Sequence, residues 1–149
     1  MPQKQKILFF DHELTLSMHP GMSDILFKLA RYHALYLVSD QENIGASLDK
    51  AGLRKCFLDV FEKERLGRVP KSDQWFYLTP IDELNLEKEK VLVIAHSVEG
   101  IKGAKKAGLP VIACTWGSQE RELLIGAKPD YLADHPQELL SVLQSINLA

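Results

Sequence analysis

In the segment Ile7-Leu8-Phe9-Phe10-Asp11-His12-Glu13-Leu14-Thr15, four apolar residues are followed directly by a carboxylate. A short apolar run of this kind is typical of a buried strand in a parallel sheet. Open α/β sheets place their chemistry at the carboxyl ends of the strands, so Asp11 is the first candidate site residue. A carboxylate there can act as a nucleophile or a metal ligand, and Glu13 can direct a second carboxyl group into the same crevice.

The rest of the chain repeats this arrangement, because short apolar runs alternate with amphipathic stretches. The expected strands are 7–10, 35–38, 91–94, 111–113 and 131–133, with a further short strand near 58–61. The expected helices are 22–32, 44–51, 73–84, 98–107, 119–124 and 137–146. Gly52 and Gly108 stand where two of these helices should end. Repeated βα units predict an α/β fold, a three-layer doubly wound parallel sheet with helices on both faces.

The carboxyl ends of parallel strands meet at one edge of a sheet, so Asp11, Ser39 and His96 are expected to lie near one another. The longest irregular stretch, roughly 62–72, has the length of loops often found at functional edges. Its basic side chains include Arg65, Arg68 and Lys71.

The composition fits one globular domain over residues 1–149, with 46% hydrophobic and 26% charged residues. The net charge is −2, from 18 basic and 20 acidic residues, and no basic block is present, so neither nucleic acid nor a membrane surface is an expected partner. Cys56 and Cys114 are far apart in the sequence, which favours reduced thiols in a cytoplasmic protein. The segment 1–10 is too short for a signal peptide or a membrane span.

Four segments share the motif order of one known family. They are Asp11-His12-Glu13-Leu14-Thr15, Leu37-Val38-Ser39-Asp40, Lys71 after Pro70, and the run from Val91 to Ala113. In this order the chain resembles the haloacid dehalogenase superfamily of phosphohydrolases over nearly its whole length. The first segment is similar to the DxDxT motif, and the second to a strand ending in Ser or Thr. Lys71 falls near the family's phosphate-binding lysine, with the usual Lys-Pro order reversed, and the last segment resembles the fourth motif.

The resemblance implies a two-step phosphoryl transfer. Asp11 would attack phosphorus, and Glu13 would protonate the leaving oxygen and then activate water. Ser39 and Lys71 would hold phosphate oxygens. In this family Mg²⁺ offsets the repulsion between carboxylate and phosphate, held by the Asp11-type carboxylate, a backbone carbonyl at the Glu13 position and an aspartate of the fourth motif. The expected cofactor is therefore Mg²⁺ if the chain is active, and none otherwise.

The metal-binding part of the pattern is altered. His96 stands at the aspartate position and Gly100 at a further acidic position, which leaves Glu99 as the nearby carboxylate. The metal ligands expected from the sequence are therefore Asp11, Glu13 and Glu99. Magnesium prefers hard oxygen ligands, whereas a neutral imidazole suits zinc, iron, nickel or copper. If no metal ion reduces it, the repulsion between two unit negative charges about 4 Å apart costs roughly 4 kcal/mol at an effective dielectric near 20. A cost of this size approaches about three orders of magnitude in reaction rate.

Each candidate also has a purely structural interpretation. Asp11 could cap the turn after its strand, Ser39 could bond its own backbone, and Lys71 could be solvated. For His96, a satisfied neutral histidine at a strand end is favoured over a metal ligand. The aromatic segment 75–77 is expected to pack in the core rather than to stack on a ligand.

No cap domain is expected, because single helices and strands fill the intervals between the motifs. A capless site is open, so we expect a larger partner or a second copy in a homo-oligomer to cover it.

Two functions remain possible for a chain with these motifs. The altered metal positions favour a degenerate relative that acts as a binding or regulatory module for a phosphorylated ligand or a protein. The alternative is an active capless phosphatase that forms an aspartyl-phosphate on Asp11.

Other doubly wound folds match less well. Neither GxGxxG nor GxxxxGK[ST] is present, which argues against a dinucleotide-binding Rossmann domain and a P-loop protein. A receiver-like domain shares the sheet, but it needs an acidic cluster supplied largely by different strand ends.

Overall fold

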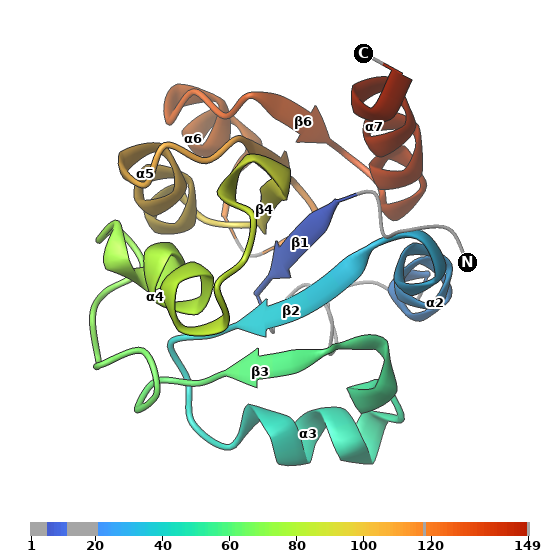
Figure 1. Cartoon of the computed structure of the whole chain (residues 1–149). Helices are drawn as coiled ribbons and strands as arrows, with labels where there is room; N and C mark the ends of the chain where they lie inside the picture. The colour runs from blue at the N-terminus through green and yellow to red at the C-terminus, as the bar shows by residue number, and fades with distance from the viewer. Residues whose placement is uncertain (1–5, 12–20, 118, 149) are drawn as a thin grey trace.

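The computed structural model describes residues 6–11, 21–117 and 119–148, with side chains up to 146. Within these residues six parallel strands form one sheet in the order β3-β2-β1-β4-β5-β6 (Figure 1). The strands are β1 (Ile7–Phe10), β2 (Ala34–Val38), β3 (Asp59–Phe61), β4 (Val91–Ala95), β5 (Val111–Cys114) and β6 (Tyr131–Ala133). All six lie where the sequence predicts them.

The helices form the two outer layers. They are α2 (Met22–Tyr32), α3 (Ile44–Ala51), α4 (Trp75–Leu84), α5 (Val98–Lys106), α6 (Arg121–Gly126) and α7 (Pro136–Leu148), with short 3-10 turns at Arg54–Cys56 and Lys88–Lys90. The buried residues of α2, α3 and α7 belong to one hydrophobic core, and those of α4, α5 and α6 belong to the other. Figure 1 shows these two groups on opposite sides of the sheet. The predicted three-layer, doubly wound α/β fold is confirmed.

The alternation of side chains along β1 determines where its following residue points. Leu8 and Phe10 belong to the core under α2, α3 and α7, whereas Phe9 belongs to the core under α4 and α5. Each of these side chains is at most 1% exposed, and burying one such side chain contributes about 1.5–3 kcal/mol. Because successive side chains of a strand face opposite sides, Asp11 is directed to the face that α4 and α5 cover.

Glycine marks the ends of two helices, as the sequence predicts. Gly52 ends α3 with φ 74°, and Gly108 follows α5 with φ 76°. Both values lie in the left-handed region, which glycine adopts without the penalty that a Cβ atom would bring. These two stops return the chain toward strands β3 and β5.

Two helix starts differ from the prediction. The helix expected at 73 begins at Trp75, because the Asp73 carboxylate accepts a hydrogen bond from the Trp75 N–H (2.8 Å) and holds a turn before α4. The helix expected at 119 begins at Arg121, because Glu120 is extended with ψ 144°. Both differences shorten or shift a helix without changing the order of elements.

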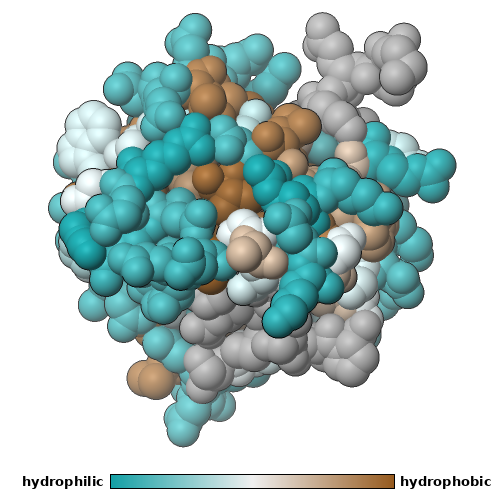
Figure 2. Space-filling view, turned by 90° about the horizontal axis from the view of Figure 1, so that it is seen from below, coloured by the Kyte–Doolittle hydropathy of each residue, from teal (hydrophilic) through white to brown (hydrophobic). Residues whose placement is uncertain are grey.

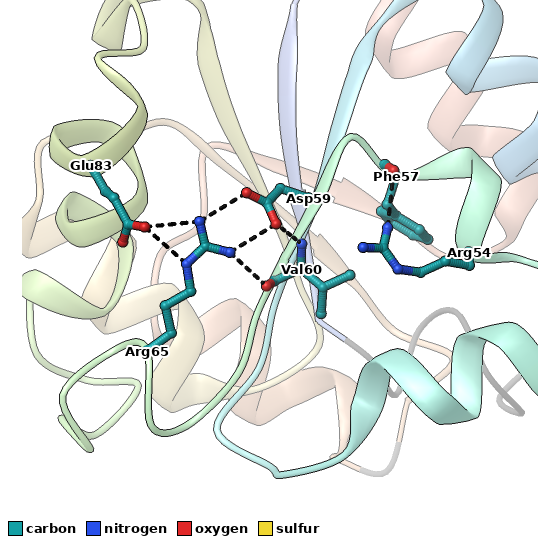
Figure 3. Close-up of polar contacts among 6 residues, drawn as sticks. All are labelled: Arg54, Phe57, Asp59, Val60, Arg65 and Glu83. Carbon is teal, nitrogen blue, oxygen red and sulfur yellow. Dashed lines mark hydrogen bonds and ion pairs between the residues drawn. The ribbon is translucent and has the colours of Figure 1, made fainter.

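Arg65 connects the edge strand β3 to α4 (Figure 3). Its guanidinium donates to both carboxylate oxygens of Asp59 (2.8 and 2.9 Å) and to Glu83 of α4 (3.0 Å). It also lies over the ring of Phe61, 3.7 Å from the centroid. A planar, bidentate arrangement of this kind is among the stronger surface ion pairs. Asp59 begins β3, so Arg65 is bound at the amino end of that strand, away from the edge that carries Asp11.

The face of the molecule seen in Figure 2 is mostly hydrophilic, with hydrophobic residues in small areas. In the described part of the chain, no helix has both the length and the apolar character needed to cross a bilayer.

Candidate functional site

The candidate site lies where the strand order reverses. The sheet runs from β1 to β2 and β3 in one direction, and from β1 to β4, β5 and β6 in the other. In β1, Phe10 pairs with Leu37 and with Ile94, so the carboxyl ends of the three central strands are level. Asp11 and His96 follow two of these neighbouring strands. Such a reversal point is where open α/β sheets bind ligands.

Asp11, Lys71 and His96 meet at this point. The ammonium of Lys71 forms an ion pair with Oδ2 of Asp11 and lies 3.9 Å from Oδ1 of Asp40. Nδ1 of His96 is 3.7 Å from the same Asp11 oxygen. The side chains of Asp11, Lys71 and His96 are 7%, 9% and 3% exposed. The expected proximity of Asp11 and His96 is therefore observed, and Lys71 joins them from the 62–72 loop. The catalytic role of Asp11 and the phosphate-binding role of Lys71 stay predictions.

Helix α5 sets the position of Lys71 through a glycine. A Cβ atom on Gly103 would lie 1.9 Å from the carbonyl oxygen of Lys71, which is far closer than two such atoms approach each other. Only glycine leaves room for this backbone contact. The close packing fixes the segment before α4 against α5, and the Lys71 side chain can then extend to Asp11.

Lys71 is the basic residue of the 62–72 loop that contacts Asp11 in the described structure. Arg65 is bound to Asp59 and Glu83, as described above. Arg68 is 51% exposed and pairs with Glu64 (2.9 Å). Arg65 and Arg68 thus have carboxylate partners other than Asp11, so the loop does not bring all of its positive charge to the site.

Ser39 is placed at the same edge but is engaged with the backbone. It is fully buried, its N–H donates to the carbonyl of Phe61 (2.9 Å), and its Oγ accepts from the N–H of Gln41 (3.0 Å). This is the turn contact that the structural interpretation of Ser39 predicts. The phosphate-binding role of Ser39 stays a prediction. Glu13, which the sequence predicts to be catalytic together with Asp11, lies outside the described residues.

A cleft of about 320 Å³ opens beside the Asp11–Lys71 pair. Its polar lining includes Asp40, Lys71, Ser72, His96, Glu99 and Gln119. The cleft is lined by two carboxylates, Asp40 and Glu99, and by one ammonium, Lys71, which also pairs with Asp11. The site therefore carries more negative than positive charge when His96 is neutral. A divalent anion would be repelled by this arrangement unless further positive charge were supplied.

Glu99 is exposed at the first turn of α5. Its own backbone N–H lowers the pKa of the carboxyl group, as do a hydrogen bond from Gln119 and the charge of Lys71, while partial burial acts in the opposite direction. The Nε2 of Gln119 lies 3.2 Å from Oε1 of Glu99, and the Oε1 of Gln119 accepts from the N–H of Val98 (2.9 Å). Glu99 is thus a charged carboxylate at neutral pH, held beside the helix start by Gln119.

The described residues do not fit magnesium. No three His, Cys, Asp or Glu side chains within 6–11, 21–117 and 119–148 are grouped closely enough to hold a metal ion. Of the predicted ligands, Asp11 is paired with an ammonium, Glu99 is hydrogen-bonded to Gln119, and Glu13 is not described. His96 contributes an imidazole, which is a poor ligand for Mg²⁺. Magnesium binding by Asp11, Glu13 and Glu99 therefore stays a prediction, and the described donor atoms do not support it.

Three residues of this region had no assigned role in the sequence analysis: Asp40, Gly103 and Gln119. Tyr77 was expected only to pack in the core, and it is buried there. Asp40 directly follows Ser39 and could have been noticed as a second strand-end carboxylate. Gly100 and Gly103 are three residues apart, which places them on one face of a helix and signals a close approach. Nothing in the sequence marks Gln119, because its partners are about twenty positions away.

Comparisons with known proteins agree with this architecture. A family model described as haloacid dehalogenase-like hydrolase matches residues 6–108, which is more than half of the chain. A phosphoglycolate phosphatase from Synechococcus elongatus is 27% identical over 141 residues, covering 88% of this chain and 61% of that protein. The chain thus spans about three fifths of the length of this relative, and less of the other curated relatives.

Solved structures show the same fold. A candidate phosphatase from Clostridium difficile has a TM-score of 0.79 at 14% identity, covering 95% of this chain and all of that one. The hydrolase YfnB from Bacillus subtilis, determined with magnesium bound, has a TM-score of 0.69 at 23% identity, covering 84% of this chain and 55% of that one. At these identities the structural likeness supports the fold alone. Because the family model matches more than half of the sequence, this chain belongs to the haloacid dehalogenase-like hydrolases.

Proposed function

We propose that this chain is a phosphohydrolase-like domain with little or no phosphatase activity, and that it acts as a binding or regulatory module. The observation that carries the proposal is the buried ion pair between Lys71 and Asp11, with His96 beside the same carboxylate oxygen. The expected nucleophile is thereby neutralised by a side chain of the protein itself. An ammonium that already pairs with Asp11 and lies 3.9 Å from Oδ1 of Asp40 also has less positive charge to offer a phosphate group.

The charges around the cleft support the same conclusion. Asp40 and Glu99 line it, and Lys71 is already shared between Asp11 and Asp40. Two like unit charges about 6 Å apart repel each other by roughly 3 kcal/mol at an effective dielectric near 20. A phosphate dianion entering this cleft without a metal ion would therefore bind weakly, which favours a protein partner over a phosphorylated ligand.

Magnesium would supply the missing positive charge if it were bound. In that case Asp11 and the undescribed Glu13 would be the residues to hold it, and the alternative function would apply, an active capless phosphatase. The family membership and the phosphatase relatives support this alternative at the level of reaction class. The described donor atoms, which do not suit the ion, favour the first function.

We further propose that a protein partner or a second copy of the chain covers the cleft, because the described residues add no cap over it. The buried, free thiols of Cys56 and Cys114 support a cytoplasmic protein. Sedimentation of the purified chain, alone and in cell extract, tests this part. A strictly monomeric profile in both conditions would contradict it.

A phosphatase assay separates the two functions. The chain and the variant Asp11→Asn are incubated with an aryl phosphate and Mg²⁺, Mn²⁺, Co²⁺ or Zn²⁺, with Asp49→Asn, an exposed residue of α3, as the matched control. We expect turnover near the background rate in all three proteins. Hydrolysis that persists in Asp49→Asn and disappears in Asp11→Asn would overturn the proposal and establish the active phosphatase.

A further inference from the structure

Tyr77 of α4 fills the space beside Gly100 of α5. A Cβ atom on Gly100 would lie 3.1 Å from the phenol oxygen of Tyr77, 3.2 Å from Oγ of Ser97 and 3.3 Å from Cβ of Ala95. These contacts are tight enough that a neighbouring atom would have to move by a few tenths of an ångström to admit the Cβ atom. A longer side chain at position 100, such as an aspartate, would meet the phenol directly, so Gly100 and Tyr77 fit together as a pair.

The phenol of Tyr77 is neutral and close to the site. Burial raises the pKa of Tyr77 far above its usual range, and the negative charges of Asp11 and Asp40 raise it further. Its ring stacks on Phe9 with 6.4 Å between centroids, which fixes it in the core that α4 and α5 cover. A protonated phenol brings no negative charge to the position where the family has a carboxylate, and it is a poor ligand for a hard divalent cation.

We propose that Tyr77 keeps position 100 of α5 from carrying a carboxylate ligand for a divalent cation, because its phenol oxygen lies 3.1 Å from where the Cβ atom of such a residue would be. Three features then act together. His96 replaces one acidic ligand, the Tyr77–Gly100 pair removes the space for another, and Lys71 supplies the positive charge at Asp11. The inference rests on the proposed function, since it gives a physical cause for the weak metal site.

A metal-binding experiment with restored carboxylates tests the role of Tyr77. Isothermal titration with MgCl₂, and with MnCl₂ as a second cation, is carried out on four proteins. They are the unchanged chain, Tyr77→Phe, the double variant His96→Asp/Gly100→Asp, and the triple variant that adds Tyr77→Phe to the double. Phenylalanine keeps the ring on Phe9 and removes only the oxygen.

We expect the triple variant to bind the cation at least about tenfold more tightly than the double variant, which corresponds to about 1.4 kcal/mol. The unchanged chain and Tyr77→Phe should bind weakly, because neither carries the added carboxylates. Equal affinities of the triple and double variants would overturn the inference. Tight binding by the unchanged chain would instead overturn the proposed function, because its metal site would then be intact.

A double-mutant cycle gives a second measurement that needs neither a metal ion nor a large substitution. The free energy of unfolding in urea is measured for Gly100→Ala in the unchanged chain and in Tyr77→Phe. We expect Gly100→Ala to cost more stability in the unchanged chain than in the Tyr77→Phe background. The added methyl group meets a phenol oxygen only in the unchanged chain. An equal effect in the two backgrounds would show that the phenol does not restrict position 100, and it would contradict the inference even if the triple variant failed to fold.

Discussion

The ammonium of Lys71 forms an ion pair with Oδ2 of Asp11, and both side chains are almost completely buried. Asp11 directly follows the central strand β1, whereas Lys71 belongs to the turn before α4. A buried ion pair costs desolvation energy that its mutual attraction largely offsets, but removing one partner leaves the other charge buried alone. The pair is therefore a sensitive point for stability as well as the centre of the candidate site.

Replacing Lys71 by methionine should destabilise the fold strongly. Met is similar in length but carries no charge, so Asp11 would be left without its ammonium. We expect the free energy of unfolding to fall by roughly 3 kcal/mol, measured by urea denaturation at pH 7. The double variant Lys71→Met/Asp11→Asn should regain part of this loss, because it no longer buries an unpaired charge. If Lys71→Met were as stable as the unchanged chain, the buried pair would not exist in solution.

Replacing Gly103 by alanine should displace the segment that carries Lys71. The new Cβ atom would overlap the Lys71 carbonyl oxygen, so we expect a loss of roughly 1–3 kcal/mol in the free energy of unfolding. Gly45→Ala in α3 is the matched control, because its Cβ would have only an ordinary contact of 3.9 Å with Glu62. There the gain in helix propensity should leave stability unchanged or raise it by up to about 1 kcal/mol. Equal stability of the two variants would argue against the close backbone contact.

The Asp59–Arg65 pair should make stability depend on pH in the acid range. The hydrogen bonds from Arg65 lower the pKa of Asp59, a hydrogen bond from the Val60 N–H acts in the same direction, and partial burial opposes them. A lowered pKa in the folded state stabilises the fold above the unfolded value of about 3.9, and this contribution is lost as the pH falls through the folded pKa.

The variant Asp59→Asn checks this pH dependence. We expect it to be less stable than the unchanged chain by about 1 kcal/mol at pH 7, and the difference to shrink as the pH falls below about 4. Urea denaturation at several pH values measures it, with Glu89→Gln, an exposed carboxylate of the 3-10 turn before β4, as the control. A difference that stayed constant down to pH about 2 would contradict the assignment of the lowered pKa to Asp59.

Glu62 should act as the N-terminal cap of α3. Asn43 precedes this helix with φ 60° and makes no side-chain capping bond, whereas Oε2 of Glu62 accepts from the Ile44 N–H at 2.5 Å. Glu62→Ala should therefore cost about 1 kcal/mol of stability, as the loss of a helix cap usually does. The exposed Glu64, which pairs with Arg68, provides the comparison, and Glu64→Ala should change stability by less than about 0.5 kcal/mol. Thermal denaturation of both variants distinguishes them, and a larger effect at Glu64 would refute the cap.

The local sequence was sufficient to predict the order of helices and strands and the edge of the sheet at which the site lies. Each apolar run, such as Ile7–Phe10, forms the strand that its composition predicts, because a run buried on both faces has few other stable arrangements in a parallel sheet. Gly52 and Gly108 end helices for a reason that lies in their own backbone. Parallel strands put their carboxyl ends together, so the proximity of Asp11 and His96 followed from the order of elements alone.

The side chains that complete the site are selected by the packing of elements that lie far apart in the sequence. Arg65, Arg68 and Lys71 lie within one short loop and carry the same charge, yet Lys71 alone of the three pairs with Asp11 in the described structure. That choice depends on where the loop packs against α5 at Gly103. Likewise the room beside Gly100 depends on a tyrosine from another helix. Such contacts join residues far apart in the chain, so they are set by how the layers pack and not by any local pattern.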